Sequence, residues 1–244
     1  MKMGPQFVAA DGRWWSNSVW VLATLAIGLA LPLCAQTPRV FRDGNSWVEE
    51  TTGSLPAGRE FRAFTELGSF QVQGNAAQIS YVVRKRSYAD TEEAAQKQFE
   101  QLRFSASKSG DAVVLDGKLI GRNYNRLTAD IAVQIPRLTQ VVKVETRAGS
   151  LSFNSISGSV VGVTSAGAVK LDDISGTVKI ISGGGVIEAG NVGSDLYLKS
   201  GSGNVTVERV NGQVIVKNGL AGSETLVVNP PQKLQEGDTI KVKG

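Results

Sequence analysis

Apolar and polar positions recur every eighteen residues over the C-terminal half of the chain. The tripeptide Ile-Ser-Gly occurs at 156–158 and again at 174–176, each time followed by a hydroxyl residue and a valine. Fixed-period similarity of this kind indicates an internal repeat. Aligning the two copies and extending the alignment in both directions gives five consecutive rows: 128–145, 146–163, 164–181, 182–199 and 200–217.

Each row predicts two short strands joined by turns. Apolar residues alternate with polar ones in both halves of a row, which is the period-two pattern of a half-buried strand. Glycine and short polar residues lie between the halves and favour tight turns. The apolar positions form columns, one of which contains Val133, Leu151, Val169, Ile187 and Val205.

Rows of one length with aligned apolar columns are expected to stack, with strands in parallel ladders about 4.8 Å apart. The rows show no 3.6-residue pattern and are rich in β-branched residues and glycine, which argues against a helical repeat. We therefore expect a mainly β fold, a parallel β-solenoid of about five 18-residue coils. The coil should be right-handed, as parallel β crossovers nearly always are.

The flanking segments predict covers for the two ends of the solenoid. Residues 45–127 read as an N-terminal α/β cap of strands plus a helix over about 91–107, starting at a capping box of Asp90 and Glu93. Residues 218–244 break the repeat with a Pro-Pro pair and are expected to form a C-terminal cap. A linker over 36–44 would precede the N-terminal cap.

The first 35 residues have the features of a signal peptide. Lys2 and Arg13 precede the apolar run Val19–Leu33, and cleavage after Ala35 fits the small-residue rule at that position. This predicts an exported protein in the periplasm, the outer envelope or the extracellular space. An uncleaved leader or a lipidated Cys34 would instead hold the chain at a membrane, although the bulky residue before Cys34 disfavours lipidation.

Charge and residue types exclude several classes of chemistry. The formal net charge is only +4 and is spread along the chain, so nucleic acid is not an expected partner. The chain has no histidine and one cysteine, which rules out Ser-His-Asp and Cys-His catalysis and histidine-ligated metals. The glycine-rich stretches 182–190 and 200–208 lack the ending of a phosphate-binding loop and the aspartates of calcium-binding repeats. No catalytic residue, cofactor or metal is expected.

Two charged clusters offer alternatives. The adjacent carboxylates Asp172 and Asp173 could serve a carbohydrate-active β-helix enzyme, but rows of constant length leave no long loops to wall a cleft. A solvated turn is the favoured interpretation. The basic run 84–86 should be divided in a strand, with Arg84 and Arg86 on one face and Lys85 on the other.

The order of these parts resembles the bacterial family of candidate adhesins of the DUF4097 type. The resemblance rests on "GSFQVQG", on "DTEEAAQKQFEQL", and on rows of the "ISGSVVGV" and "SGSGNVTVE" kind. It implies an exported adhesin-like β-solenoid with no catalytic motif. Because some members lie near regulators of envelope stress, it also implies an alternative role as an envelope-stress regulatory partner.

The outward-facing columns hold the candidate contact residues. Lys170 and Glu188 should pair across adjacent rows. Another outward column contains Val161, Lys179, Tyr197 and Ile215. Three of these four side chains are apolar or aromatic, although the face should be exposed to solvent. We expect Lys179, Tyr197 and Ile215 to contact a protein or polysaccharide partner at the envelope; a cap or a chain end folded over the stripe is the alternative.

Overall fold

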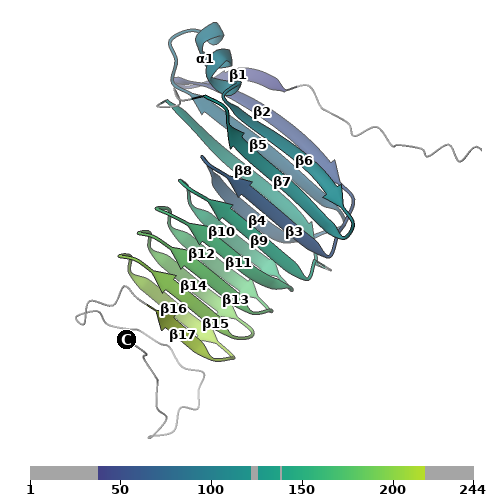
Figure 1. Ribbon diagram of the computed structural model, residues 1–244, viewed down its shortest axis with the longest axis vertical. Helices are drawn as coiled ribbons and strands as arrows, with labels where there is room; N and C mark the ends of the chain where they lie inside the picture. Colours follow the sequence, from purple (N-terminus) through teal and green to yellow (C-terminus); the bar gives the residue numbers. More distant parts are fainter. Residues whose placement is uncertain (1–37, 122–125, 138, 218–244) are drawn as a thin grey trace, which may run out of the picture. The chain divides into compact units, whose positions relative to one another are not determined.

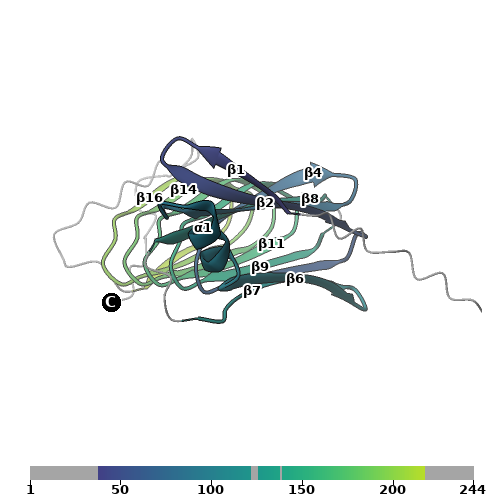
Figure 2. The ribbon, with the colours of Figure 1, turned by 90° about the horizontal axis from the view of Figure 1, so that it is seen from above.

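The computed structural model describes residues 38–121, 126–137 and 139–217, which form a mainly β structure. The predicted leader (1–35), Cys34 and the predicted C-terminal cap (218–244) lie outside the described residues. Figure 1 shows the described strands lying side by side, and Figure 2 shows that they form two layers. The apolar core lies between these layers.

The strands form two sheets. The first has nine strands in the order β1 (Arg39–Asp43), β2 (Ser46–Leu55), β5 (Ile79–Ser87), β8 (Leu127–Pro136), β4 (Ser69–Ala76), β10 (Leu151–Ile156), β12 (Val169–Ile174), β14 (Ile187–Val192) and β16 (Val205–Val210). The second has eight, in the order β17 (Val214–Lys217), β15 (Leu196–Ser200), β13 (Val178–Ser182), β11 (Ser159–Thr164), β9 (Val141–Thr146), β3 (Glu60–Thr65), β7 (Ala112–Leu119) and β6 (Leu102–Ser109).

The strands of residues 146–217 pair in parallel at the predicted spacing. In the first sheet Leu151 pairs with Val169, Val169 with Ile187, and Ile187 with Val205. The strands of the second sheet are related in the same way, so that Val160 pairs with Val178. The alternating positions point inward, and the buried side chains from both sheets form one apolar cluster. The eighteen-residue repeat therefore sets the strand register in this part of the chain.

The predicted alignment of row 128–145 is wrong in its first half. Strand β8 does not neighbour β10, because β4 lies between them. Val133 pairs with Val72, and Val72 pairs with Phe153 rather than with Leu151. The cause is the connection after β8. Ile131 and Val142 are eleven residues apart, whereas the equivalent Leu151 and Val160 are nine residues apart, and the two extra residues shift the register.

The strand that lies next to β10, where the first half of row 128–145 was expected, comes from the predicted N-terminal cap. Strand β3 lies between β7 and β9, and strand β4 lies between β8 and β10. Phe61 pairs with Val142, and Phe70 pairs with Leu151, so residues 60–76 add a row to both parallel ladders. The segment 45–127 is thus part cap and part repeat.

The predicted helix over 91–107 is too long, and the predicted linker over 36–44 contains a strand. Helix α1 spans Glu92–Phe99, and its N-cap is Thr91, whose hydroxyl accepts a hydrogen bond from the Ala94 N–H, rather than Asp90. Residues after it form β6, because Leu102–Ser109 pairs antiparallel with β7. Strand β1 pairs with β2 and so begins the first sheet. Helix α1 packs against β2, β5 and β6, and so contacts both sheets (Figure 2).

Buried hydroxyl groups mark each turn from the second sheet back to the first. Five of them lie opposite one another in the ladder: Thr65, Thr146, Thr164, Ser182 and Ser200. A glycine follows each one three residues later. The backbone N–H of Gly167 donates to Thr164 Oγ1 at 3.1 Å, and Thr164 Oγ1 donates to the carbonyl oxygen of Gly149, one row earlier, at 2.8 Å.

The glycines themselves are required by close packing between rows. A Cβ atom on Gly167 would collide with the carbonyl oxygen of Gly149, and one on Gly185 would collide with that of Gly167. Because the obstacle is backbone rather than a flexible side chain, a larger residue cannot be accommodated by a rotamer change. Neighbouring turns can therefore stack only with glycine at this position.

We predict that Gly167→Ala lowers the free energy of unfolding by about 2–3 kcal/mol, because the turn must separate from the row before it. Gly184→Ala is the matched control: its Cβ would meet only Ser202 Oγ, at 3.5 Å, and its cost should stay within about 0.5 kcal/mol. Urea denaturation of both variants measures the difference. Equal unfolding midpoints would contradict the packing argument.

We also predict that Thr164→Val destabilises the protein by about 1–3 kcal/mol, because the half-buried Gly167 N–H loses its acceptor and the Gly149 carbonyl loses a donor. Thr164→Ser keeps the hydroxyl, as Ser182 and Ser200 do in later rows, and should restore most of the loss. Urea denaturation again gives the measurement. A serine variant as unstable as the valine variant would show that the methyl group, not the hydroxyl, matters.

Candidate functional site

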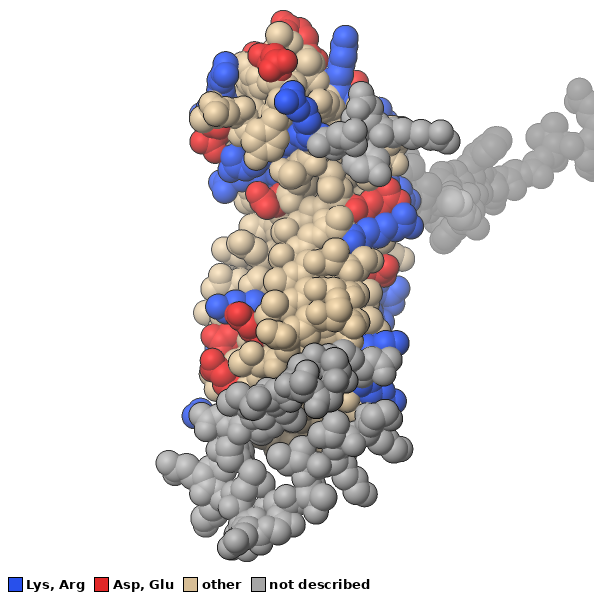
Figure 3. Space-filling model, turned by 90° about the vertical axis from the view of Figure 1, so that its left-hand side faces the viewer, with Lys and Arg blue, Asp and Glu red and all other residues tan. Residues whose placement is uncertain are grey.

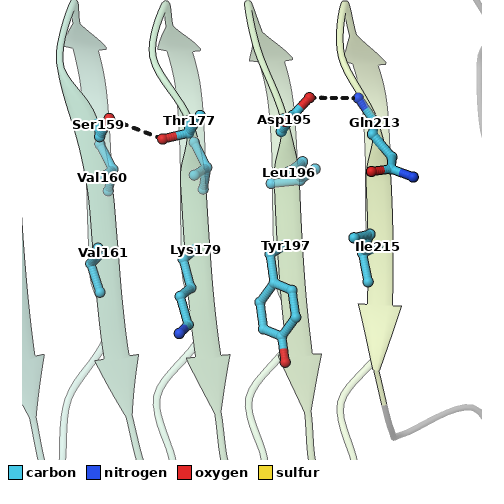
Figure 4. A pocket seen from close by; sticks show the side chains of 11 residues that line it. Ser159, Val160, Val161, Thr177, Lys179, Asp195, Leu196, Tyr197, Gln213 and Ile215 are labelled. Atoms are coloured by element: carbon cyan, nitrogen blue, oxygen red, sulfur yellow. Dashed lines mark hydrogen bonds between the residues drawn. The ribbon is translucent and has the colours of Figure 1, made fainter.

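Three side chains expected to form a contact surface lie next to one another on the outer face of the second sheet. Lys179 on β13 pairs with Tyr197 on β15, and Tyr197 pairs with Ile215 on β17. Val161 on β11 precedes them in the same line. Figure 4 shows the four side chains on adjacent strands. The structure thus brings the predicted residues together, while their role in binding stays a prediction.

Two further lysines belong to this face and were not among the expected contact residues. Lys179 Nζ lies 5.5 Å from the centroid of the Tyr197 ring, and Lys217 Nζ lies 5.7 Å from it, within the range of cation–π attraction. Lys199 follows Tyr197 by two residues on β15 and pairs with Lys217. We call these five residues the lysine–tyrosine surface: Lys179, Tyr197, Lys199, Ile215 and Lys217.

Sequence alternation contained the signal for the added lysines. Residues two apart on a strand share a face, so Lys199 must accompany Tyr197 and Lys217 must accompany Ile215. Lys199 and Lys217 are exposed, whereas Tyr197 and Ile215 are half-buried among their neighbours. The surface therefore has an apolar centre and charged groups that reach into solvent.

An open depression of about 210 Å³ lies beside this surface (Figure 4). Polar groups line one side of it: the Thr177 hydroxyl donates to Ser159 Oγ at 2.9 Å, and the Gln213 N–H donates to Asp195 Oδ1 at 2.9 Å. Val161, Lys179, Tyr197 and Ile215 line the rest. The depression thus offers hydroxyl and amide groups next to an aromatic ring.

A second depression, of about 350 Å³, continues along the same sheet face and shares Val161 with the first. Its lining is mainly apolar between charged side chains, and includes Arg62, Phe64, Val114, Lys143, Glu145 and Val163. Exposed apolar side chains thus continue beyond the predicted stripe to β3 and β7, but Lys143 and Glu145 interrupt them on β9.

Glu60 on β3 organises the charges at the far end of this sheet face. Its carboxylate accepts a hydrogen bond from Arg62 at 2.7 Å, and its other oxygen lies 3.0 Å from Lys143 Nζ. These two partners, Arg62 first, lower the pKa of Glu60 to about 2. The hydrogen bond to Glu60 also raises the pKa of Arg62. Both positive charges here therefore share one carboxylate partner within the protein.

The basic run 84–86 is divided as predicted. Arg84 pairs with Glu50 at 2.6 Å, and Arg86 pairs with Asp43 at 2.8 Å. Lys85 points inward and is buried, where its ammonium contacts Glu49 and donates to the Phe99 carbonyl oxygen at the end of α1. This lysine fastens the helix to the sheet, so the run is structural and forms no continuous basic patch.

The adjacent carboxylates Asp172 and Asp173 lie at a bend of β12. Asp173 has a φ of 53°, as does Ser155 one row earlier, and Asp172 Oδ1 accepts from the Asn191 side chain at 3.4 Å. The pair therefore shapes the strand end. Lys170 and Glu188 approach each other to 4.0 Å, the cross-row pair that the sequence predicts. The described ranges contain no group of three or more acidic, histidine or cysteine side chains able to hold a metal ion.

One side of the molecule carries few charges. In Figure 3 the middle of the displayed face is formed by uncharged residues, with lysine, arginine and acidic side chains along both margins. The four turns at 147–150, 165–168, 183–186 and 201–204 contain a single charged residue, Arg147. Across 38–121, 126–137 and 139–217, no helix has the length and apolar character needed to span a membrane.

Comparison with known proteins gives structural neighbours only. No protein-family model and no curated protein matches the chain. A candidate cell adhesion protein from Clostridium sporogenes is 11% identical, covers 75% of this chain and all of its own, and has a TM-score of 0.41. A candidate adhesin from Bacteroides fragilis is 9% identical over 70% of this chain and 94% of its own, with a TM-score of 0.33.

A candidate lipid binding protein from Parabacteroides distasonis is 11% identical over 78% of this chain and 98% of its own, with a TM-score of 0.28. At such scores, adhesion and lipid binding are properties of those proteins alone. The resemblance to the DUF4097 type stays a prediction.

We predict that the stabilising contribution of Glu60 depends on pH. A carboxylate whose pKa is lowered on folding stabilises the protein above the pKa of the unfolded chain, and this contribution is lost as pH falls through the folded value, about 2. Glu60→Gln should therefore lower the urea midpoint relative to wild type at pH 6, and progressively less between pH 4.5 and pH 2.

Glu208→Gln is the control, since Glu208 is exposed and forms no ion pair within the described part of the chain. Its urea midpoint should follow that of wild type throughout. A Glu60→Gln deficit that is the same at pH 6 and at pH 2.5 would contradict the assignment.

Proposed function

We propose that this protein is an exported, adhesin-like β-solenoid that binds a partner at the cell envelope and has no catalytic role. The parallel ladders at eighteen-residue spacing support a solenoid of stacked coils. The right-handed turn rests on the general preference of parallel β crossovers, and export rests on the apolar leader sequence.

The observation that carries the binding role is the apolar line Val161, Tyr197 and Ile215 on a solvent-facing sheet. Outward positions of a sheet that faces water are ordinarily polar. Here they form two adjoining depressions bordered by charged groups. A sheet face that exposes apolar side chains between charged ones in this way is typical of an interaction surface.

The turns between strands support a role without catalysis. Rows 146–163, 164–181, 182–199 and 200–217 all have the same length, and none contains an inserted loop. Enzymes enclose their substrates in concave sites. The flat face formed by equal rows is better suited to a polymer or to the surface of another protein.

We predict that Tyr197→Ser combined with Ile215→Ser reduces co-sedimentation of the purified protein with isolated bacterial envelopes by at least about five-fold, because the apolar centre of the surface is removed. Both side chains point outward, so the unfolding midpoint should change little. Sedimentation and urea denaturation measure the two properties.

Tyr88→Ser combined with Ile120→Ser is the matched control. These residues are also a tyrosine and an isoleucine, 47% and 60% exposed, and they lie outside the lysine–tyrosine surface. The control should sediment with envelopes as wild type does. If the Tyr197 and Ile215 variant sediments as wild type does, the lysine–tyrosine surface does not bind the envelope.

A further inference from the structure

The lysine–tyrosine surface carries uncompensated positive charge. No carboxylate of residues 38–121, 126–137 or 139–217 forms an ion pair with Lys179, Lys199 or Lys217. Asp195, which directly precedes β15 and lines the adjoining depression, uses its Oδ1 to accept a hydrogen bond from the Gln213 backbone. This differs from the other end of the same sheet face, where Glu60 forms ion pairs with both Arg62 and Lys143.

The three lysines border Tyr197 and come from three consecutive strands, β13, β15 and β17. Lys199 pairs with Lys217, whereas Lys179 pairs with Tyr197, which precedes Lys199 by two residues. The lysines therefore lie around the tyrosine rather than on one line across the strands. A polyanion that lies over Tyr197 can contact all three ammonium groups.

The rest of the surface has the groups that a sugar ring requires. Tyr197 offers an apolar ring with a polar tip, between two ammonium groups. Ser159, Thr177 and Gln213 line the adjoining depression and can exchange hydrogen bonds with sugar hydroxyls. Unpaired positive charge, an aromatic ring and hydrogen-bonding groups thus point to the same class of ligand.

We infer that the lysine–tyrosine surface binds an acidic polysaccharide, with the polymer crossing β13, β15 and β17 and its carboxylates contacting Lys179, Lys199 and Lys217. The inference rests on the proposed binding role and specifies its ligand. Complementary charge on an open surface makes the affinity sensitive to salt, since ions screen exposed charges beyond about 10 Å at 0.1 M.

The test uses the full-length protein and polygalacturonate, titrated by calorimetry at 50 mM and 500 mM NaCl. We expect binding at low salt that weakens at least ten-fold at high salt. The combined variant Lys179→Gln, Lys199→Gln and Lys217→Gln should lose at least ten-fold in affinity at low salt. The control variant Lys97→Gln, Lys118→Gln and Lys170→Gln removes the same charge from exposed sites elsewhere and should stay within two-fold of wild type.

Four results would overturn the inference. They are no binding of polygalacturonate at 50 mM NaCl, equal binding of neutral dextran, equal binding of poly-glutamate, and an equal loss in the control variant. The proposed function is tested separately by envelope sedimentation. If the Tyr197 and Ile215 variant fails to sediment while polygalacturonate does not bind, the surface stands and the ligand class is wrong.

Discussion

The close approach of glycine backbones between neighbouring rows is the constraint on which the rest of the structure depends. A Cβ at Gly167 or Gly185 has no space, because the carbonyl of the preceding row occupies it. The buried hydroxyl three residues earlier holds the same glycine by its N–H. The backbone of each turn therefore repeats that of the turn before it, and this repetition requires rows of equal length. Equal rows in turn align Lys179, Tyr197 and Ile215 on the outside.

Alternation of apolar and polar residues was sufficient to align residues 146–217, because each of those rows packs against the row eighteen residues away. It failed in the first half of row 128–145, where the spatial neighbour β4 comes from far earlier in the chain. The segment from Thr65 to Gly68 has the hydroxyl and glycine spacing of the later turns, and Phe70 and Val72 follow as Leu151 and Phe153 do. A search at one constant period does not find a row that lies outside that period.

Local pattern was also ambiguous after the helix. Leu102 and Ala106 continue the spacing of Ala95 and Phe99 on a helical face, but they fit an alternating strand equally well, and pairing with β7 decides between them. On the lysine–tyrosine surface, sequence identified the central residues because an apolar column on a solvent-facing sheet is unusual. The sequence did not distinguish the lysines that lack ion pairs from Lys143, which pairs with Glu60, because ion pairing depends on side-chain geometry across strands.

The position of row 60–76 has a consequence for the order of folding. Its strands β3 and β4 lie between strands of later segments, so both of its neighbours are complete only when β10 has been made. A ribosome releases the N-terminus first, and contacts between distant segments form slowly. The row therefore emerges early and waits with exposed strand edges until much of the remaining chain has followed. Row 60–76 is therefore completed out of the order of synthesis, whereas rows 146–217 can be added in that order.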